Sequence, residues 1–122
     1  FTDHRMPREG DLEHRFSDRH LVVTLENGLF HKVCGTREIM VNSLHAQAVD
    51  KLAPGFEIEC VSLDGVTEGI RHTSAKAFCV GVQWHAEWRF EKNPLSLGLW
   101  REFGSACRER AVGRSGKKIA AE

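Results

Sequence analysis

A histidine and a glutamate two residues apart, His85 and Glu87, are the side chains whose types and spacing point most directly to chemistry. They follow an apolar run, 77–84, which predicts a strand buried on both faces of an α/β sheet. Sites of open α/β sheets lie beyond the carboxyl ends of strands, and residues two apart in an extended chain point the same way. We therefore expect both side chains to face one crevice, with Glu87 bonded to the imidazole.

A pair of this kind suits the general base of a cysteine hydrolase. The imidazole accepts the thiol proton, while the carboxylate fixes the tautomer and orientation of the ring. Histidine fits this role because its reference pKa of about 6.5 lies near neutrality. The motif is short, however, and a strand-end histidine bonded to a neighbouring carboxylate for packing reasons is the alternative interpretation.

A second polar stretch, 41–49, lies where a predicted strand passes into a predicted helix. Ser43 is expected to cap a brief helix over Leu44–Leu52, which Pro54 and Gly55 end. Backbone N–H groups at such a helix start can hold a carboxylate. Capping alone also explains the stretch, so by itself it does not predict a binding site.

The elements that must position these residues follow from hydrophobic periodicity and turn signals. Strands are predicted at His20–Leu25, Glu38–Asn42, Phe56–Ser62 and Val66–His72, in addition to 77–84. The pair Asp64-Gly65 predicts a hairpin between the third and fourth of them. Gly28–Val33 is expected to form a helical turn, and residues 1–19 a charged, solvated loop that in one alternative leans over the crevice.

A longer amphipathic helix is predicted after Asn93-Pro94, with Asn93 as its cap. Gly113 is the expected end of this helix. Its apolar stripe repeats every four residues and consists of Leu95, Leu99, Phe103 and Cys107. The remaining tail, 114–122, is basic and expected to be disordered. The order of elements indicates an α/β fold with a β-hairpin annex.

Composition narrows the function classes. The 17 basic and 17 acidic residues cancel, which gives no reason to expect a nucleic-acid or membrane partner. The chain shows no signal peptide, so we expect a cytoplasmic protein with reduced, mostly buried cysteines. The histidines at positions 4, 14, 20 and 31 have no zinc-motif spacing, so neither a metal nor another cofactor is expected.

Several separated blocks together resemble one known family. These blocks are Asn-Ser-Leu-His-x-Gln-Ala-Val from Asn42, Leu-Ala-Pro-Gly from Leu52, Asp-Gly-Val-x-Glu from Asp64, Gly-Val-Gln-Trp-His-x-Glu-Trp from Gly81 and Pro-Leu-Ser from Pro94. In this order they resemble the C-terminal half of the gamma-glutamyl-gamma-aminobutyrate hydrolase family, whose members are class I glutamine-amidotransferase-like proteins. The resemblance runs from about Asp11 to about Ala111.

This resemblance implies a three-layer, flavodoxin-like α/β domain, of which residues 1–113 form the C-terminal part. It also implies hydrolysis of a gamma-glutamyl amide by a Cys-His-Glu triad, and with it a place in putrescine catabolism. His85 is then the base, Glu87 its orienting carboxylate, and Ser43 and His45 are candidate contacts of a small-molecule substrate. A homo-oligomer is a further possibility.

The chain departs from the family pattern at two points. Ala86 stands between the histidine and the glutamate, where the family usually has proline. The Gly-x-Cys-x-Gly elbow that carries the nucleophile is absent, and Cys34, Cys60, Cys79 and Cys107 are each expected to be structural. Since the chain also lacks an initiator methionine, we expect a fragment that is inactive alone.

Three other functions stay open at this point. The first is a glutaminase domain that passes ammonia to a synthetase. The second is a non-catalytic binding domain in which His85 and Glu87 are relics. The third, metal-assisted hydrolysis through His45, His85 and Glu87, has the least support.

Overall fold

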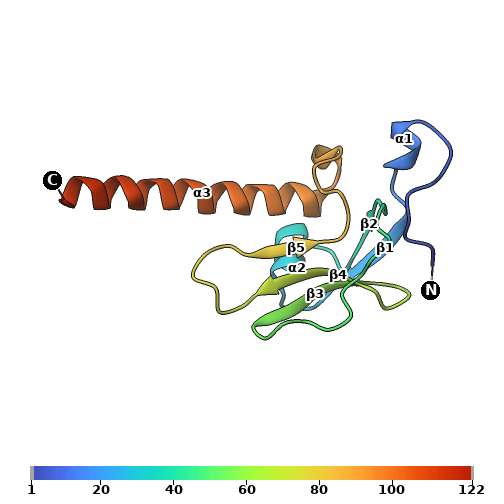
Figure 1. Ribbon diagram of the computed structural model, residues 1–122, viewed down its shortest axis with the longest axis horizontal. Helices are drawn as coiled ribbons and strands as arrows, with labels where there is room; N and C mark the ends of the chain where they lie inside the picture. Colours follow the sequence, from blue (N-terminus) through green and yellow to red (C-terminus); the bar gives the residue numbers. More distant parts are fainter. Residues whose placement is uncertain (1, 122) are drawn as a thin grey trace.

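Five antiparallel strands form one sheet in the order β2-β1-β3-β4-β5 (Figure 1). The structure, a computed structural model, describes residues 2–121, with side chains as far as residue 116. The strands are β1 His20–Thr24, β2 Glu38–Val41, β3 Phe56–Ser62, β4 Thr67–His72 and β5 Val80–Val82. The first four confirm the strands predicted from β-branched and alternating residues to within one residue.

The β3–β4 hairpin lies in the middle of this sheet, although the sequence placed it in an annex. Gly65 turns the chain with a φ of +86°, and its N–H donates to the carbonyl of Ser62 at 3.0 Å. Glycine adopts this left-handed conformation without the steric penalty of a Cβ atom. The mixed α/β class predicted from the sequence is confirmed.

Among residues 2–121 the helices are α1 Leu12–Arg15, α2 Leu29–Cys34, the 3₁₀ turn η1 Phe90–Lys92, and α3 Pro94–Ala121. Asn93 caps α3 as predicted, because its Oδ1 accepts the N–H of Ser96 at 3.0 Å. The predicted end at Gly113 was wrong, since the helix continues through it. Of the tail predicted to be disordered, 114–121 extend α3 and residue 122 lies outside the described residues. Within the described part of the chain, no helix combines the length and hydropathy that a membrane crossing requires.

A buried carboxylate on β3 holds the start of α2. Gly28 offers this helix no side-chain cap, and Oε2 of Glu59 accepts the N–H of Phe30 at 3.0 Å instead. The other oxygen, Oε1, accepts from Nε of Arg71 on β4 at 2.7 Å. The charge of Glu59 is therefore paired, and one of the free N–H groups at the helix start is satisfied.

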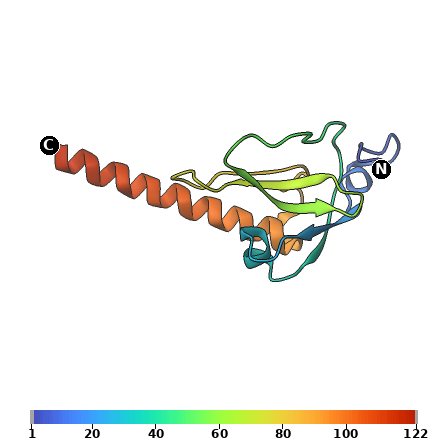
Figure 2. The ribbon, with the colours of Figure 1, turned by 90° about the horizontal axis from the view of Figure 1, so that it is seen from below.

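The hydrophobic core lies between the sheet and the two helices α2 and α3. It consists of Val22, Phe30, Val41, Cys60, Trp84, Leu95 and Leu99. The helices approach closely at Gly98, where an added Cβ would lie 2.9 Å from the Cβ of Val33. Farther along, α3 extends past the sheet (Figure 2), so the last part of the predicted stripe, Phe103 and Cys107, is exposed.

Two local predictions were wrong. The helix expected over Leu44–Leu52 is absent, because the Ser43 hydroxyl and the His45 N–H both donate to the carbonyl of His4. The buried strand expected over 77–84 is reduced to Val80–Val82, which forms an edge of the sheet and is only half-buried. Its apolar residues match those of an interior strand, but within the described chain they have a strand neighbour on one side only.

Candidate active site

His85 and Glu87 lie just past the end of β5, with their side chains on the same side of the backbone. Nδ1 of His85 is 2.7 Å from Oε1 of Glu87. The preceding residue anchors this turn, because Trp84 is buried and its indole N–H donates to the hydroxyl of Ser96 at 3.1 Å. The pair itself remains accessible, with 44% of the His85 side chain and 62% of the Glu87 side chain exposed.

Asn42, directly after β2, holds the backbone of His85 from both sides. Its Oδ1 accepts the N–H of His85 at 2.8 Å, and its Nδ2 donates to the carbonyl of the same residue at 3.1 Å. The Asn42 side chain is buried, so these two bonds are shielded from water. This contact fixes the position of the imidazole through its main chain.

The neighbouring residue Ala86, which replaces the proline of the family pattern, is also held. Its carbonyl accepts the indole N–H of Trp100 on α3 at 3.0 Å. The greater backbone freedom of alanine is thus offset by a bond to the long helix. The His85–Glu87 contact forms with alanine at this position.

The N-terminal segment covers one side of the pair, as in the alternative expected for residues 1–19. The Phe16 ring meets the His85 ring edge-on with 5.3 Å between centroids, and it also contacts Trp88 at 4.8 Å. An ion pair between Glu13 and Arg89 ties α1 to the turn that follows the pair. The arginines within residues 1–19 do not line the cavity beside His85, whereas Arg89 does.

A cavity of about 200 Å³ opens beside His85. Aromatic and polar side chains line it, among them Phe16, Asp18, Trp88 and Lys92. Burial raises the pKa of Asp18 above that of an exposed aspartate. No cysteine is among the described residues that line this cavity.

The electrostatics of the pair favour one tautomer. Burial alone would raise the pKa of Glu87, but the hydrogen bond and charge of His85 outweigh it, so this pKa lies below its ordinary value. Glu87 is therefore ionised near neutrality and can only accept hydrogen bonds. Nδ1 of His85 then carries the proton, and Nε2 keeps the free lone pair that a general base needs.

With His85 acting as a general base, replacing Glu87 by glutamine is expected to lower kcat/KM of the intact protein about a hundredfold, because the ring loses its orienting charge.

The lowered pKa of Glu87 also predicts a pH effect on stability. The Glu87 carboxylate stabilises the fold above its ordinary pKa of 4.5, and this contribution is lost as the pH falls through the lowered value. The urea unfolding midpoints of the wild type and of Glu87→Gln should therefore differ at neutral pH and converge in acid. A difference that widens in acid would contradict a lowered pKa of Glu87.

The structure does not bring Ser43 and His45 to this pair. The Ser43 hydroxyl donates to the carbonyl of His4 at 2.7 Å, and Nε2 of His45 lies 3.5 Å from the buried Glu68. Their role as substrate contacts stays a prediction. The sequence offered no local signal for the gathering of His4, His20, His45 and Glu68, because its members come from separate segments.

The cysteines have varied surroundings, and the expectation that most are buried was wrong. All four are free thiols; Cys60 is buried, Cys34 is partly buried, and Cys79 and Cys107 are exposed. Burial raises the pKa of the Cys60 thiol far above its ordinary value, so Cys60 is inert as a nucleophile. Cys79 precedes β5 and contributes to a different surface, between α3 and the segment 73–79.

Comparison with known proteins places the chain in a family. The chain is 33% identical over 106 residues to gamma-glutamyl-gamma-aminobutyrate hydrolase PuuD of Escherichia coli K12, which covers 86% of this chain and 41% of that protein. It is 37% identical over 81 residues to the putative glutamine amidotransferase PB2B2.05 of Schizosaccharomyces pombe, covering 66% of this chain and 31% of that protein. The chain thus spans less than half the length of these relatives. Residues 1–87, including the His85–Glu87 pair, match the Peptidase C26 family, and the chain belongs to that family.

Proposed function

We propose that the intact protein hydrolyses a gamma-glutamyl amide such as gamma-glutamyl-GABA, with His85 as general base and Glu87 as its orienting carboxylate. The observation that supports this most directly is the 2.7 Å contact between Nδ1 of His85 and Oε1 of Glu87 beside an open cavity. Membership of the Peptidase C26 family supports a hydrolase. The relative from Escherichia coli bears the name of this activity.

The proposed reaction requires a cysteine, and none of the described residues that line the cavity is one. His85 takes the proton of that thiol, and the sulfur attacks the γ-carbonyl carbon of the substrate. As the C–N bond breaks, His85 returns the proton to the leaving amine, and an acyl thioester remains. Water, deprotonated by His85, then attacks the thioester to release glutamate and restore the thiol.

Exposed apolar surface on α3 supports a nucleophile carried by a further part of the domain. Trp100 and Phe103 are 43% and 47% exposed, and β5 has a strand partner on one side only within the described chain. A domain segment that continued the sheet beyond β5 would cover these groups. We propose that this segment brings the cysteine to His85, and that the chain alone is inactive. Residence in the cytoplasm and a homo-oligomer stay predictions.

A glutaminase that supplies ammonia is the second candidate, favoured by the name of the relative from Schizosaccharomyces pombe. The assay that separates the two incubates the intact protein with gamma-glutamyl-GABA and, in parallel, with glutamine. Faster turnover of gamma-glutamyl-GABA than of glutamine supports the hydrolase, whereas turnover of glutamine alone supports the glutaminase. No turnover of either amide would favour a non-catalytic binding domain.

The 122-residue chain is the control in this assay and is expected to turn over neither substrate. Substitution of each free cysteine by serine completes the design. Activity of the isolated chain that disappears with Cys34→Ser or Cys79→Ser would contradict a nucleophile outside the chain.

A further inference from the structure

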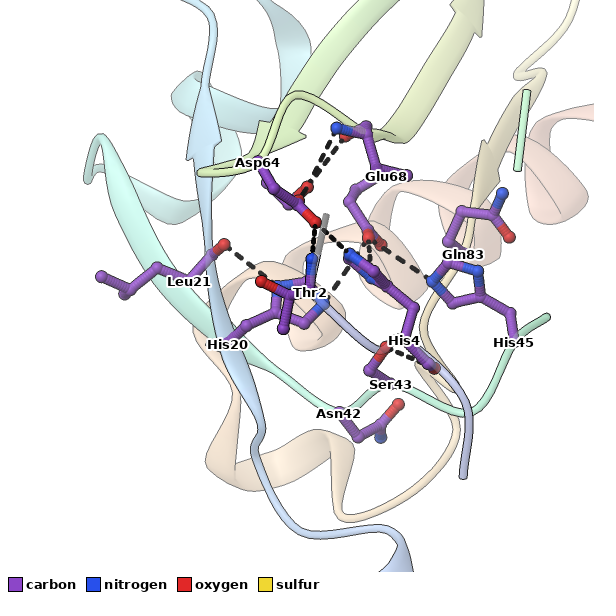
Figure 3. A network of polar contacts seen from close by, with 12 residues as sticks. Thr2, His4, His20, Leu21, Asn42, Ser43, His45, Asp64, Glu68 and Gln83 are labelled. Atoms are coloured by element: carbon purple, nitrogen blue, oxygen red, sulfur yellow. Dashed lines mark hydrogen bonds and ion pairs between the residues drawn. The ribbon is translucent and has the colours of Figure 1, made fainter. Parts of the chain in front are cut away.

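Away from the His85–Glu87 pair, three imidazoles surround one buried carboxylate (Figure 3). Glu68, on β4, has no solvent-exposed side-chain surface. Its Oε1 lies 3.1 Å from Nδ1 of His4, 3.5 Å from Nε2 of His20 and 3.5 Å from Nε2 of His45. The three histidine side chains are themselves only 10–13% exposed. We refer to these four residues as the Glu68 cluster.

The outer nitrogen of each imidazole already has a hydrogen-bond acceptor. Nε2 of His4 lies 2.9 Å from Oδ2 of Asp64. Nδ1 of His20 lies 3.1 Å from the carbonyl of Leu21, and Nδ1 of His45 lies 2.7 Å from the carbonyl of Gln47. Carbonyl oxygens and the ionised carboxylate of Asp64, whose pKa lies well below its ordinary value because Ser62 and His4 hydrogen-bond to it, only accept, so these outer nitrogens carry the protons. In the neutral imidazoles the inner nitrogens then direct lone pairs at Glu68.

The inner atoms of the cluster therefore lack donors. The inner nitrogens of all three histidines and both oxygens of Glu68 are buried without a hydrogen-bond partner. Such groups are costly to bury, because each has lost its water without replacement. One proton on Glu68 would serve only one nitrogen. Protons on all three rings would place three positive charges around a single buried carboxylate.

We propose that the Glu68 cluster binds a divalent transition-metal ion of the zinc class, with His4 Nδ1, His20 Nε2 and the Glu68 carboxylate as ligands. These three ligand atoms lie within 4.8 Å of one another. Zinc bonds of about 2.0–2.1 Å in a tetrahedron place ligand atoms about 3.3 Å apart. The distances of 3.1 and 3.5 Å from Glu68 to His4 and His20 are close to that value. A single cation of this kind pairs with the facing lone pairs of these three ligands at once.

The surroundings match those of metal ligands. Ligating histidines commonly donate their second N–H to a carboxylate or a backbone carbonyl, which orients the ring and fixes its tautomer. All three histidines of the cluster have such a partner. Nε2 of His45 lies 3.5 Å from the same oxygen of Glu68. It is not one of the three ligand atoms that lie mutually close, and it supplies a further nitrogen at the rim of the site.

A metal here would connect segments that lie far apart in the sequence. Its ligands come from the N-terminal segment, from β1 and from β4. The carbonyl of His4 also accepts bonds from Ser43 and His45, in the loop that begins with Asn42. The ion would thus fix the loop that carries the Asn42 contact to His85. We assign it a structural role, which does not depend on the proposed reaction.

The test measures metal content of the intact protein, stripped with a chelator and then dialysed against buffer containing Zn²⁺. About one zinc ion per chain is expected in the wild type, and less than a tenth of that in Glu68→Gln and His20→Asn. The amide of Glu68→Gln can donate to one inner nitrogen, which favours folding without the metal. His14→Asn is the matched control, because its side chain is exposed, and it should retain the ion.

Two further measurements separate loss of the site from loss of the fold. Circular dichroism of the metal-free variants should match that of the metal-free wild type. Co²⁺ in the wild type should give visible d–d bands without thiolate charge transfer, because the ligands are nitrogen and oxygen. The proposal is overturned if the wild type takes up no zinc, if Glu68→Gln binds it equally well, or if the Co²⁺ spectrum shows thiolate ligands.

Discussion

Replacing His85 by alanine in the intact protein is expected to lower kcat/KM for the proposed gamma-glutamyl amide substrate by about four orders of magnitude. The loss should appear mainly in kcat, because the imidazole acts on the thiol proton and adds little to substrate binding. The fold should be retained, since His85 is held through its backbone by Asn42, and its side chain is 44% exposed. Steady-state kinetics with a glutamate-release assay provide the measurement.

The matched control for this variant is His14→Ala, which removes an exposed histidine from the same chain. It should keep wild-type kinetics. Added imidazole should restore part of the activity of His85→Ala, since a free base can enter the open cavity. Wild-type turnover in His85→Ala would remove the basis of the proposed mechanism.

The second large effect is expected for Asn42→Ala. This variant leaves the N–H and C=O of His85 without their partner and should reduce the free energy of unfolding by about 2 kcal/mol. We also expect a loss of about a hundredfold in kcat, because a shift of about 1 Å in a catalytic group is enough for that effect. Denaturant unfolding and steady-state kinetics on the same preparation measure the two consequences.

Two comparison variants separate positioning from general destabilisation. Thr24→Val removes the buried hydroxyl bonds to the carbonyls of Thr36 and Arg37, away from the active site, so it should lower stability but keep kcat. Asn42→Asp keeps the acceptor for the His85 N–H but loses the donor to its carbonyl, and should fall between wild type and Asn42→Ala. Equal kcat values in Asn42→Ala and Thr24→Val would show that Asn42 does not position the base.

Local signals in the sequence predicted most of the strands correctly. β1 and β3 are rich in β-branched or alternating residues, and Asp64-Gly65 marks the hairpin turn, so neighbours a few residues apart were sufficient. The prediction for residues 44–52 failed because a distant partner takes part. The expected helix over Leu44–Leu52 did not form because Ser43, its expected cap, donates to His4.

The same distinction applies to the site. The contact between His85 and Glu87 was expected from an extended chain, but it forms in a turn, in which the N–H of Trp88 donates to the carbonyl of His85 at 3.3 Å. Asn42 and Phe16 reach the pair from other segments, and neither was singled out from the sequence. The one available signal for Asn42 was its place at the start of the Asn-Ser-Leu-His block. The Glu68 cluster escaped a search for local zinc spacing, since only the folded chain brings its members together.

The anchoring of α2 by Glu59 has a consequence for the order of folding. A helix of six residues is too short to be stable by itself in water, and α2 lacks a side-chain cap of its own. Its first turn depends on a carboxylate from β3 that is in turn paired with Arg71 on β4. The hairpin must therefore be assembled before this helix can persist, so α2 and the hairpin open and close as one cooperative unit.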